Sequence, residues 1–123
     1  MTADPEQVIV IDGATLRLAG RVLRLRGVDS PLHSMSCSSV DCGAAATNAL
    51  AAMVREARVS CRTMGADALG RAFAVCQVRG MELNQAIIKA GWARADTSEQ
   101  ELRRAEATAR AEKRGVWAYD PPW

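Results

Sequence analysis

The sequence predicts one α+β domain: a small barrel of five short strands, accompanied by three helices. Two patterns predict this class. Five short segments are β-branched or alternate apolar and polar residues, and three longer segments repeat their apolar residues with helical spacing. We expect one domain, because 123 residues are enough for one hydrophobic core but not for two.

The first three strands are expected at residues 8–11, 15–18 and 21–26. Asp12-Gly13 interrupts the first as a turn signal, and Ala19-Gly20 is the turn between the second and the third. Period-two alternation on both sides of that second turn is typical of an antiparallel hairpin. Gly27 then ends the third strand.

A Ser-, Pro- and Cys-rich loop at residues 30–42 leads into an Ala-rich segment. Residues 43–57 are predicted to be a helix, because their apolar side chains gather on one face: Ala46, Leu50, Met53, Val54 and Ala57. A fourth strand is expected at 58–62 and a fifth at 72–78, with a turn at 64–70 between them.

Two further helices follow the fifth strand. The first is predicted over residues 82–90 and ends at Gly91, a residue suited to a left-handed cap. The second is predicted to begin at a capping box formed by Ser98 and Glu101 and to run to about Arg114. One helix between strands three and four, and two after strand five, favour a Greek-key barrel of the OB type.

The domain is expected to span residues 8–118, between a disordered or leader-derived segment at 1–7 and a tail at 119–123. We find no signal-peptide pattern in the polar start of the chain and no apolar run long enough to span a membrane.

Hydrophobic residues make up 49% of the chain, and the net charge is +2. That charge is too small to imply nucleic-acid binding unless basic residues cluster on one face.

Four cysteines in so short a chain favour an oxidising compartment, and hence an exported bacterial protein, periplasmic or secreted. Cys61 and Cys76 would face each other across a hairpin centred between residues 68 and 69, and Cys37 and Cys42 would close a second bridge before the first helix. Two alternatives remain open. One is a zinc site made by the cysteines with His33, and the other is a cytoplasmic protein with reduced cysteines.

Two segments near the start carry a family resemblance. Residues 12–18 read Asp-Gly-Ala-Thr-Leu-Arg-Leu, and residues 24–32 read Arg-Leu-Arg-Gly-Val-Asp-Ser-Pro-Leu. They resemble the motifs D-G-D-T-L/I-x-L/V and R-L-x-G-I/V-D-A/S/T-P-E of the staphylococcal nuclease-like (thermonuclease) family. Further matches follow in the family's order, at residues 67–74, 83–93, 105–110 and 114–118. The resemblance covers about residues 8–118 and implies an OB barrel that cleaves DNA and RNA phosphodiesters with a bound Ca²⁺.

By this resemblance, the chain retains part of the family's site. Arg24 and Arg71 stand at the two phosphate-binding arginines. Asp29 stands at one metal-binding aspartate, and Ser30 at a residue that offers its backbone carbonyl to the metal. The resemblance therefore implies an anion-binding pocket beside the remains of a metal site.

Other positions depart from the pattern. Ala14 stands where the family has its other metal-binding aspartate, and Leu32 where it has the water-activating glutamate. Leu69 replaces a tyrosine that helps to hold the phosphate, and residues 94–96 occupy the stretch that usually offers a stacking tyrosine. Loss of a general base alone lowers a rate by about 10²–10⁴.

We therefore predict a nuclease-fold domain that is impaired or inactive, with Ca²⁺ absent or weakly bound. Its retained arginines are expected to bind single-stranded nucleic acid or another anionic ligand. Two alternatives stand beside this prediction. One is a weak metal-dependent nuclease whose site is rebuilt from neighbours such as Asp12 or His33, and the other is an accessory domain that binds a protein. The sequence leaves the oligomeric state open, and it leaves Trp123 without an assigned role.

Overall fold

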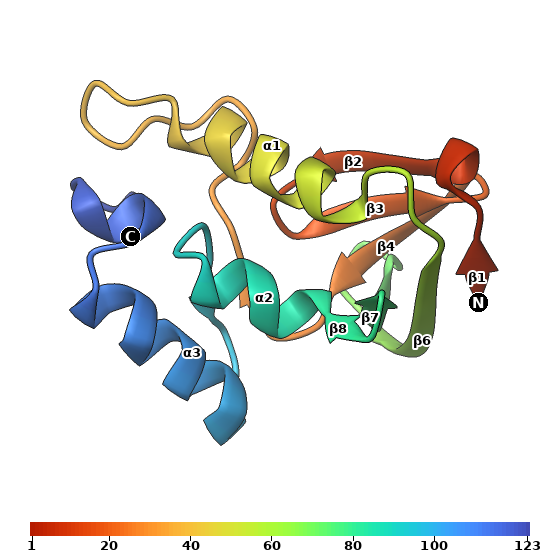
Figure 1. The fold of residues 1–123 in the computed structure, drawn as a ribbon. Helices are drawn as coiled ribbons and strands as arrows, with labels where there is room; N and C mark the ends of the chain where they lie inside the picture. Colours follow the sequence, from red (N-terminus) through yellow and green to blue (C-terminus); the bar gives the residue numbers. More distant parts are fainter.

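The computed structural model describes residues 1–123 as a mixed α+β domain with three helices and a seven-stranded sheet (Figure 1). The strands of this sheet run in the order β1-β6-β7-β4-β3-β2, and β8 pairs with β7. Their bounds are Thr2–Ala3 (β1), Val8–Asp12 (β2), Thr15–Leu18 (β3), Arg21–Leu25 (β4), Val59–Ala66 (β6), Ala72–Val78 (β7) and Met81–Glu82 (β8). A separate two-stranded sheet joins β5 (Val28–Asp29) to β9 (Arg94–Ala95).

The five long strands have the order of an OB-type Greek key, as predicted. They run β2-β3-β4-β7-β6, and β4 pairs with β7 in parallel, while the other pairs are antiparallel. No ladder joins β2 to β6, so the sheet does not close into a barrel by strand pairing. The turn between β3 and β4 has positive φ at Ala19 and at Gly20, as a two-residue hairpin loop requires.

The domain has three helices. They are α1 (Cys42–Val54), α2 (Leu83–Lys89) and α3 (Gln100–Ala111), with short 3₁₀ turns η1 (Pro5–Gln7) and η2 (Gly115–Ala118). Of these helices, α3 packs on α2 and on the small two-stranded sheet. Figure 1 shows α1 lying along β2 and α2 lying between α1 and α3. The core between helices and sheet is aliphatic, because the inward side chains of alternating strands and of the helix faces meet there; its most buried members are Leu16, Leu18, Leu23, Leu25, Leu50, Val59, Val78, Leu83, Ile87 and Ile88.

Gly91 ends α2 with positive φ, as predicted. Its backbone lies against η2, where Val116 N donates a hydrogen bond of 2.8 Å to the Gly91 carbonyl. A Cβ at position 91 would lie 2.2 Å from the carbonyl oxygen of Arg114. Glycine is therefore needed here for its conformation and also for the close approach of two backbones.

The beginning of the chain differs from the expectation of disorder. Residues 2–3 form β1, which pairs with β6, and Ala3 is 1% exposed within the core. The predicted turn at 64–70 is also shorter than expected. β6 continues to Ala66 through an irregularity between Thr63 and Ala66, because a bulge lets a strand continue past a glycine.

The predicted capping box at Ser98 is wrong. The helix α3 begins one residue later than expected, with Glu99 as its N-cap in an extended conformation, and no side chain caps it. The Glu99 carboxylate forms an ion pair with Arg26, and the Thr97 Oγ1 accepts a hydrogen bond of 3.2 Å from the Glu99 amide. Glu99 is therefore tied to Arg26, which follows β4, at the start of a helix that Ser98 does not cap.

Both expected cysteine pairs are at disulfide distance. Cys61 and Cys76 are direct partners across β6 and β7, with Cα atoms 4.1 Å apart, and the Cα atoms of Cys37 and Cys42 are 5.6 Å apart. No cysteine is free, so no thiolate is left for the zinc alternative. No helix has the length and apolar character that crossing a bilayer requires.

Candidate anion-binding site

Arg24 lies on the outer face of the sheet. Its neighbours Leu23 and Leu25 are fully buried in the core, so the alternation of β4 directs Arg24 away from them. In register it lies between Thr15 of β3 and Phe73 of β7. Strand alternation thus places an arginine and an aromatic ring side by side on one face.

An open pocket of about 340 Å³ lies at this point. Its lining comes from the end of β4, from β5, from β7 and from the loop before α3: Arg24, Leu25, Arg26, Gly27, Val28, Phe73, Asp96 and Thr97. The Nε atom of Arg24 is buried and has no hydrogen-bond partner. A buried donor without a partner costs about 1–3 kcal/mol, and an acceptor that reaches the Arg24 guanidinium would gain a charge-assisted hydrogen bond.

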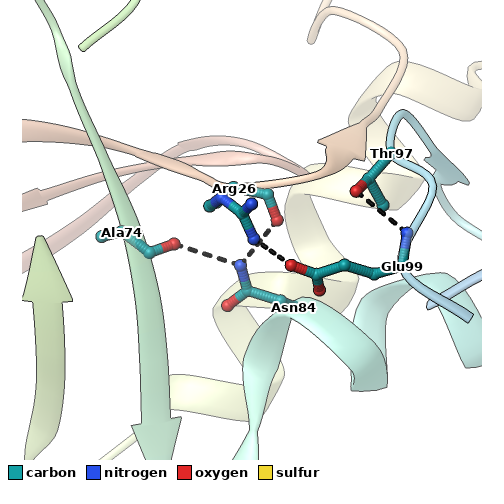
Figure 2. Close-up of polar contacts among 5 residues, drawn as sticks. All are labelled: Arg26, Ala74, Asn84, Thr97 and Glu99. Carbon is teal, nitrogen blue, oxygen red and sulfur yellow. Dashed lines mark hydrogen bonds and ion pairs between the residues drawn. The ribbon is translucent and has the colours of Figure 1, made fainter. Parts of the chain in front are cut away.

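Asn84 fixes the backbone on which the pocket is built (Figure 2). This residue of α2 is 1% exposed, and its Nδ2 donates to the Arg26 carbonyl at 2.9 Å and to the Ala74 carbonyl at 3.1 Å. Its Oδ1 accepts a hydrogen bond of 3.1 Å from the Cys76 amide. One side chain thus ties α2 to the end of β4 and to β7.

Arg26 is neutralised by a neighbour, whereas Arg24 is not. Figure 2 shows the Arg26 guanidinium facing the Glu99 carboxylate, with which it forms an ion pair. Arg24 forms no ion pair. Arg24 is therefore the unpaired cation of the pocket.

Arg71, the second expected phosphate-binding arginine, is held by Asp67. Its Nε donates to Asp67 Oδ2 at 2.7 Å, and its guanidinium side chain is 35% exposed. Partial desolvation raises the pKa of the Asp67 carboxyl, but hydrogen bonds from Arg71 and from the Leu69 amide outweigh it and leave that pKa below its ordinary value. Asp67 is thus a carboxylate that stays charged and occupied by Arg71.

The positions expected to hold Ca²⁺ do not provide a ligand set for it. Ala14 is 1% exposed and lies in the core, and Asp29 Oδ2 accepts from Arg94 Nε at 2.7 Å. The hydroxyl of Ser30 donates to the carbonyls of Pro31 and Trp92, each at 3.3 Å. No three acidic, His or Cys side chains gather anywhere in the structure, whereas Ca²⁺ requires six to eight oxygen ligands.

Asp12 and His33, the neighbours considered for a rebuilt site, have other partners. Asp12 Oδ1 accepts from the Ala14 amide at 2.8 Å, within its own turn. His33 Nδ1 lies 3.2 Å from Thr47 Oγ1. Leu32 and Leu69 are 58% and 77% exposed and offer no polar group.

Of the predicted site residues, Arg24 alone lines the pocket. The sequence did not single out Phe73 or Asn84. The signal for Phe73 was the alternation of its strand, which places it on the face opposite the buried Ala72 and Ala74. The signal for Asn84 was a polar side chain between apolar positions on a helix face that turns out to be buried.

The order of the strands and the three helices define an OB-type α+β domain. The chain belongs to the staphylococcal nuclease homologue family, whose family model matches residues 22–119. It is similar to the succinoglycan biosynthesis protein ExoI of Rhizobium meliloti (strain 1021), with 32% identity over 124 aligned residues. The match covers 94% of this chain and 65% of that relative, so the chain spans less than two thirds of the relative's length.

Proposed function

We propose that this domain has lost phosphodiester hydrolysis and binds single-stranded nucleic acid through Arg24, without a metal. One observation carries the proposal: Arg24 lines an open pocket and has no ion pair and no partner for its buried Nε, whereas the neighbouring Arg26 is already paired. A phosphate oxygen is the acceptor that a guanidinium binds best.

The loss of hydrolysis follows from the chemistry of the site. A dianionic transition state requires cations, and an attacking water requires a base. Ala14 and Leu32 supply neither a metal ligand nor a proton acceptor, and Asp29 is occupied by Arg94. Each of these defects removes a separate part of the catalysis, so the residual rate should not exceed the uncatalysed background.

The aromatic neighbour favours a nucleic acid over a simple phosphate. Phe73 pairs in register with Arg24 and lines the same pocket. Sequence-tolerant single-strand binding combines basic residues that contact phosphates with aromatic rings on which bases stack. Phe73 is the ring that would stack on a base beside the phosphate held by Arg24.

The proposal is tested by fluorescence anisotropy with a labelled oligothymidylate. Arg24→Ala should weaken binding about tenfold and reduce the salt dependence by about one phosphate contact. Arg103→Ala is the charge-matched control, because Arg103 is exposed on α3 without an ion pair and should leave both quantities unchanged. Equal losses of affinity in the two variants would reject a site at Arg24 and indicate non-specific electrostatic attraction.

The same protein tests the alternative of a rebuilt nuclease. A fluorogenic single-stranded DNA is incubated with Ca²⁺ or with a chelator, and Arg71→Ala controls for contaminating enzyme. We expect no calcium-dependent cleavage above that control. Cleavage that disappears with chelator and with Arg71→Ala would replace our proposal by the weak nuclease.

The name of the relative suggests one competitor for this assay. ExoI is named for succinoglycan biosynthesis, and a part in that process is a second possible function for this chain. Succinoglycan added to the anisotropy assay should leave oligonucleotide binding unchanged if nucleic acid is the ligand. Competition that depends on Arg24 would assign the pocket to the polysaccharide.

We further propose that the protein works in an oxidising compartment, periplasmic or secreted. The support is the pairing of all four cysteines, which a reducing cytosol would oppose. Thiol labelling of the protein recovered from cells under denaturing, non-reducing conditions tests this. Four labelled cysteines would contradict it.

A further inference from the structure

The Asp29 carboxylate already forms an ion pair with a cationic side chain, that of Arg94. Arg94 reaches it from the partner strand of the two-stranded sheet, where Asp29 and Arg94 are direct register partners. Their Nε and Oδ2 atoms are 2.7 Å apart, and the two side chains are 44% and 32% exposed for Arg94 and Asp29. An exposed pair of this kind is weak unless something else holds the long side chain in place.

The end of the chain holds Arg94. Its guanidinium lies over the ring of Trp123, 5.0 Å from the centroid, and Trp123 packs against Trp117 with centroids 5.6 Å apart. A hydrogen bond of 2.8 Å between Ser38 Oγ and Asp120 Oδ2 ties the same segment to the loop before α1. Arg94 is therefore held on two sides, by a carboxylate and by an indole ring.

We propose that Arg94 is the resident counter-cation of Asp29, and that residues 119–123 keep it there by means of Trp123. Arg94 occupies Oδ2 of this carboxylate, and a divalent metal at the remaining oxygen would lie beside the guanidinium, whose like charge repels it. The domain is therefore closed to a metal by an ion pair that it contains, in addition to the carboxylates that it lacks at positions 14 and 32.

Restoring the two lost carboxylates should not by itself restore the metal site. Ala14→Asp with Leu32→Glu returns two carboxylates but leaves Arg94 on Asp29, so Ca²⁺ should still bind weakly. Adding Arg94→Gln to that pair removes the competing cation and keeps a polar but uncharged and shorter side chain. The affinity for Ca²⁺ should then rise at least tenfold.

Calorimetric titration with Ca²⁺ alone measures this without any nucleic acid, so its result is independent of the binding function proposed above. The matched control is Arg110→Gln in the same doubly restored background. Arg110 also stacks on an indole, 4.8 Å from the centroid of Trp117, but its ion pair is with Glu106 and not with Asp29. The control should leave the Ca²⁺ affinity of the doubly restored protein unchanged.

Two results would overturn the inference. One is an equal Ca²⁺ affinity with and without Arg94→Gln, whether tight or undetectable, in proteins that give the same thermal unfolding transition. The other is an equal gain from Arg110→Gln, which would reflect net charge alone. Trp123→Ala in the doubly restored background should give a gain between those of the control and of Arg94→Gln, and no gain would remove the tail from the proposal.

Discussion

Asp67 binds both the backbone and the side chain of Arg71. Its Oδ1 accepts from the Arg71 amide at 2.8 Å, and its Oδ2 accepts from the guanidinium Nε at 2.7 Å. The Leu69 amide adds a third hydrogen bond, of 3.0 Å, to Oδ1. One carboxylate thus organises the turn between β6 and β7 and sets the position of an arginine that the family uses for phosphate.

Stability should depend on the ionisation of Asp67 at acid pH. The folded state lowers the pKa of this carboxyl, so its contribution is complete above the ordinary aspartate pKa of about 3.9. The contribution is lost as pH falls through the lower pKa of the folded state. Urea unfolding between pH 2.5 and 6 should show that the free energy of unfolding falls less at acid pH in Asp67→Asn than in the parent. Parallel pH profiles would contradict this assignment.

Asn84→Ala should destabilise the domain by about 3 kcal/mol. The change leaves the buried amide of Cys76 and the carbonyl of Arg26 without their partner, and the Ala74 carbonyl keeps only its hydrogen bond from the Arg26 amide. Urea denaturation measures the loss, and Lys89→Ala, at an exposed position of the same helix, is the control. A loss no larger than that of the control would mean that water replaces the side chain.

Leu50→Ala should cost about 2–5 kcal/mol, because Leu50 is fully buried where α1 meets the sheet and its truncation leaves a cavity. Leu69→Ala removes the same atoms from a side chain that is 77% exposed and should change stability by less than about 0.5 kcal/mol. Both values come from chemical denaturation at one pH. Similar costs at the two positions would contradict the placement of Leu69 at the surface.

The two disulfides should differ in their effect on stability. The bridge between Cys61 and Cys76 closes a separation of 15 residues, and the bridge between Cys37 and Cys42 one of 5. In the chain-entropy model these loops correspond to about 3 and about 2 kcal/mol. Each pair is replaced by alanine, and the free energies of unfolding are compared. The loss should be larger without the bridge between Cys61 and Cys76, and a larger loss from the short loop would contradict this.

Much of the fold follows from local pattern. The alternation in β3 and β4 predicted their antiparallel hairpin, and pairing about a centre between residues 68 and 69 placed Cys61 opposite Cys76. The small strands β5, β8 and β9 were not predicted, because two residues carry no measurable period. The start of α3 was misplaced because the ion pair between Arg26 and Glu99 joins residues far apart in the sequence.

The candidate site was less accessible to sequence reasoning. Motif position identified Arg24, yet nothing in a motif distinguishes a free arginine from one held by Asp67. The ion pair between Asp29 and Arg94, and the stacking of Arg94 on Trp123, join segments that meet only in the folded chain. Such contacts depend on tertiary geometry, and a single sequence carries no record of it.

The parallel pairing of β4 with β7 sets an order for folding. β2, β3 and β4 lie early in the chain and can pair locally, but one edge of β4 stays unpaired until β7 docks. β7 first meets its neighbour β6 across a short turn, and that hairpin alone brings Cys61 to Cys76. In an oxidising compartment this pair can therefore close before the two halves dock, so that a covalently closed hairpin adds to the open edge of β4.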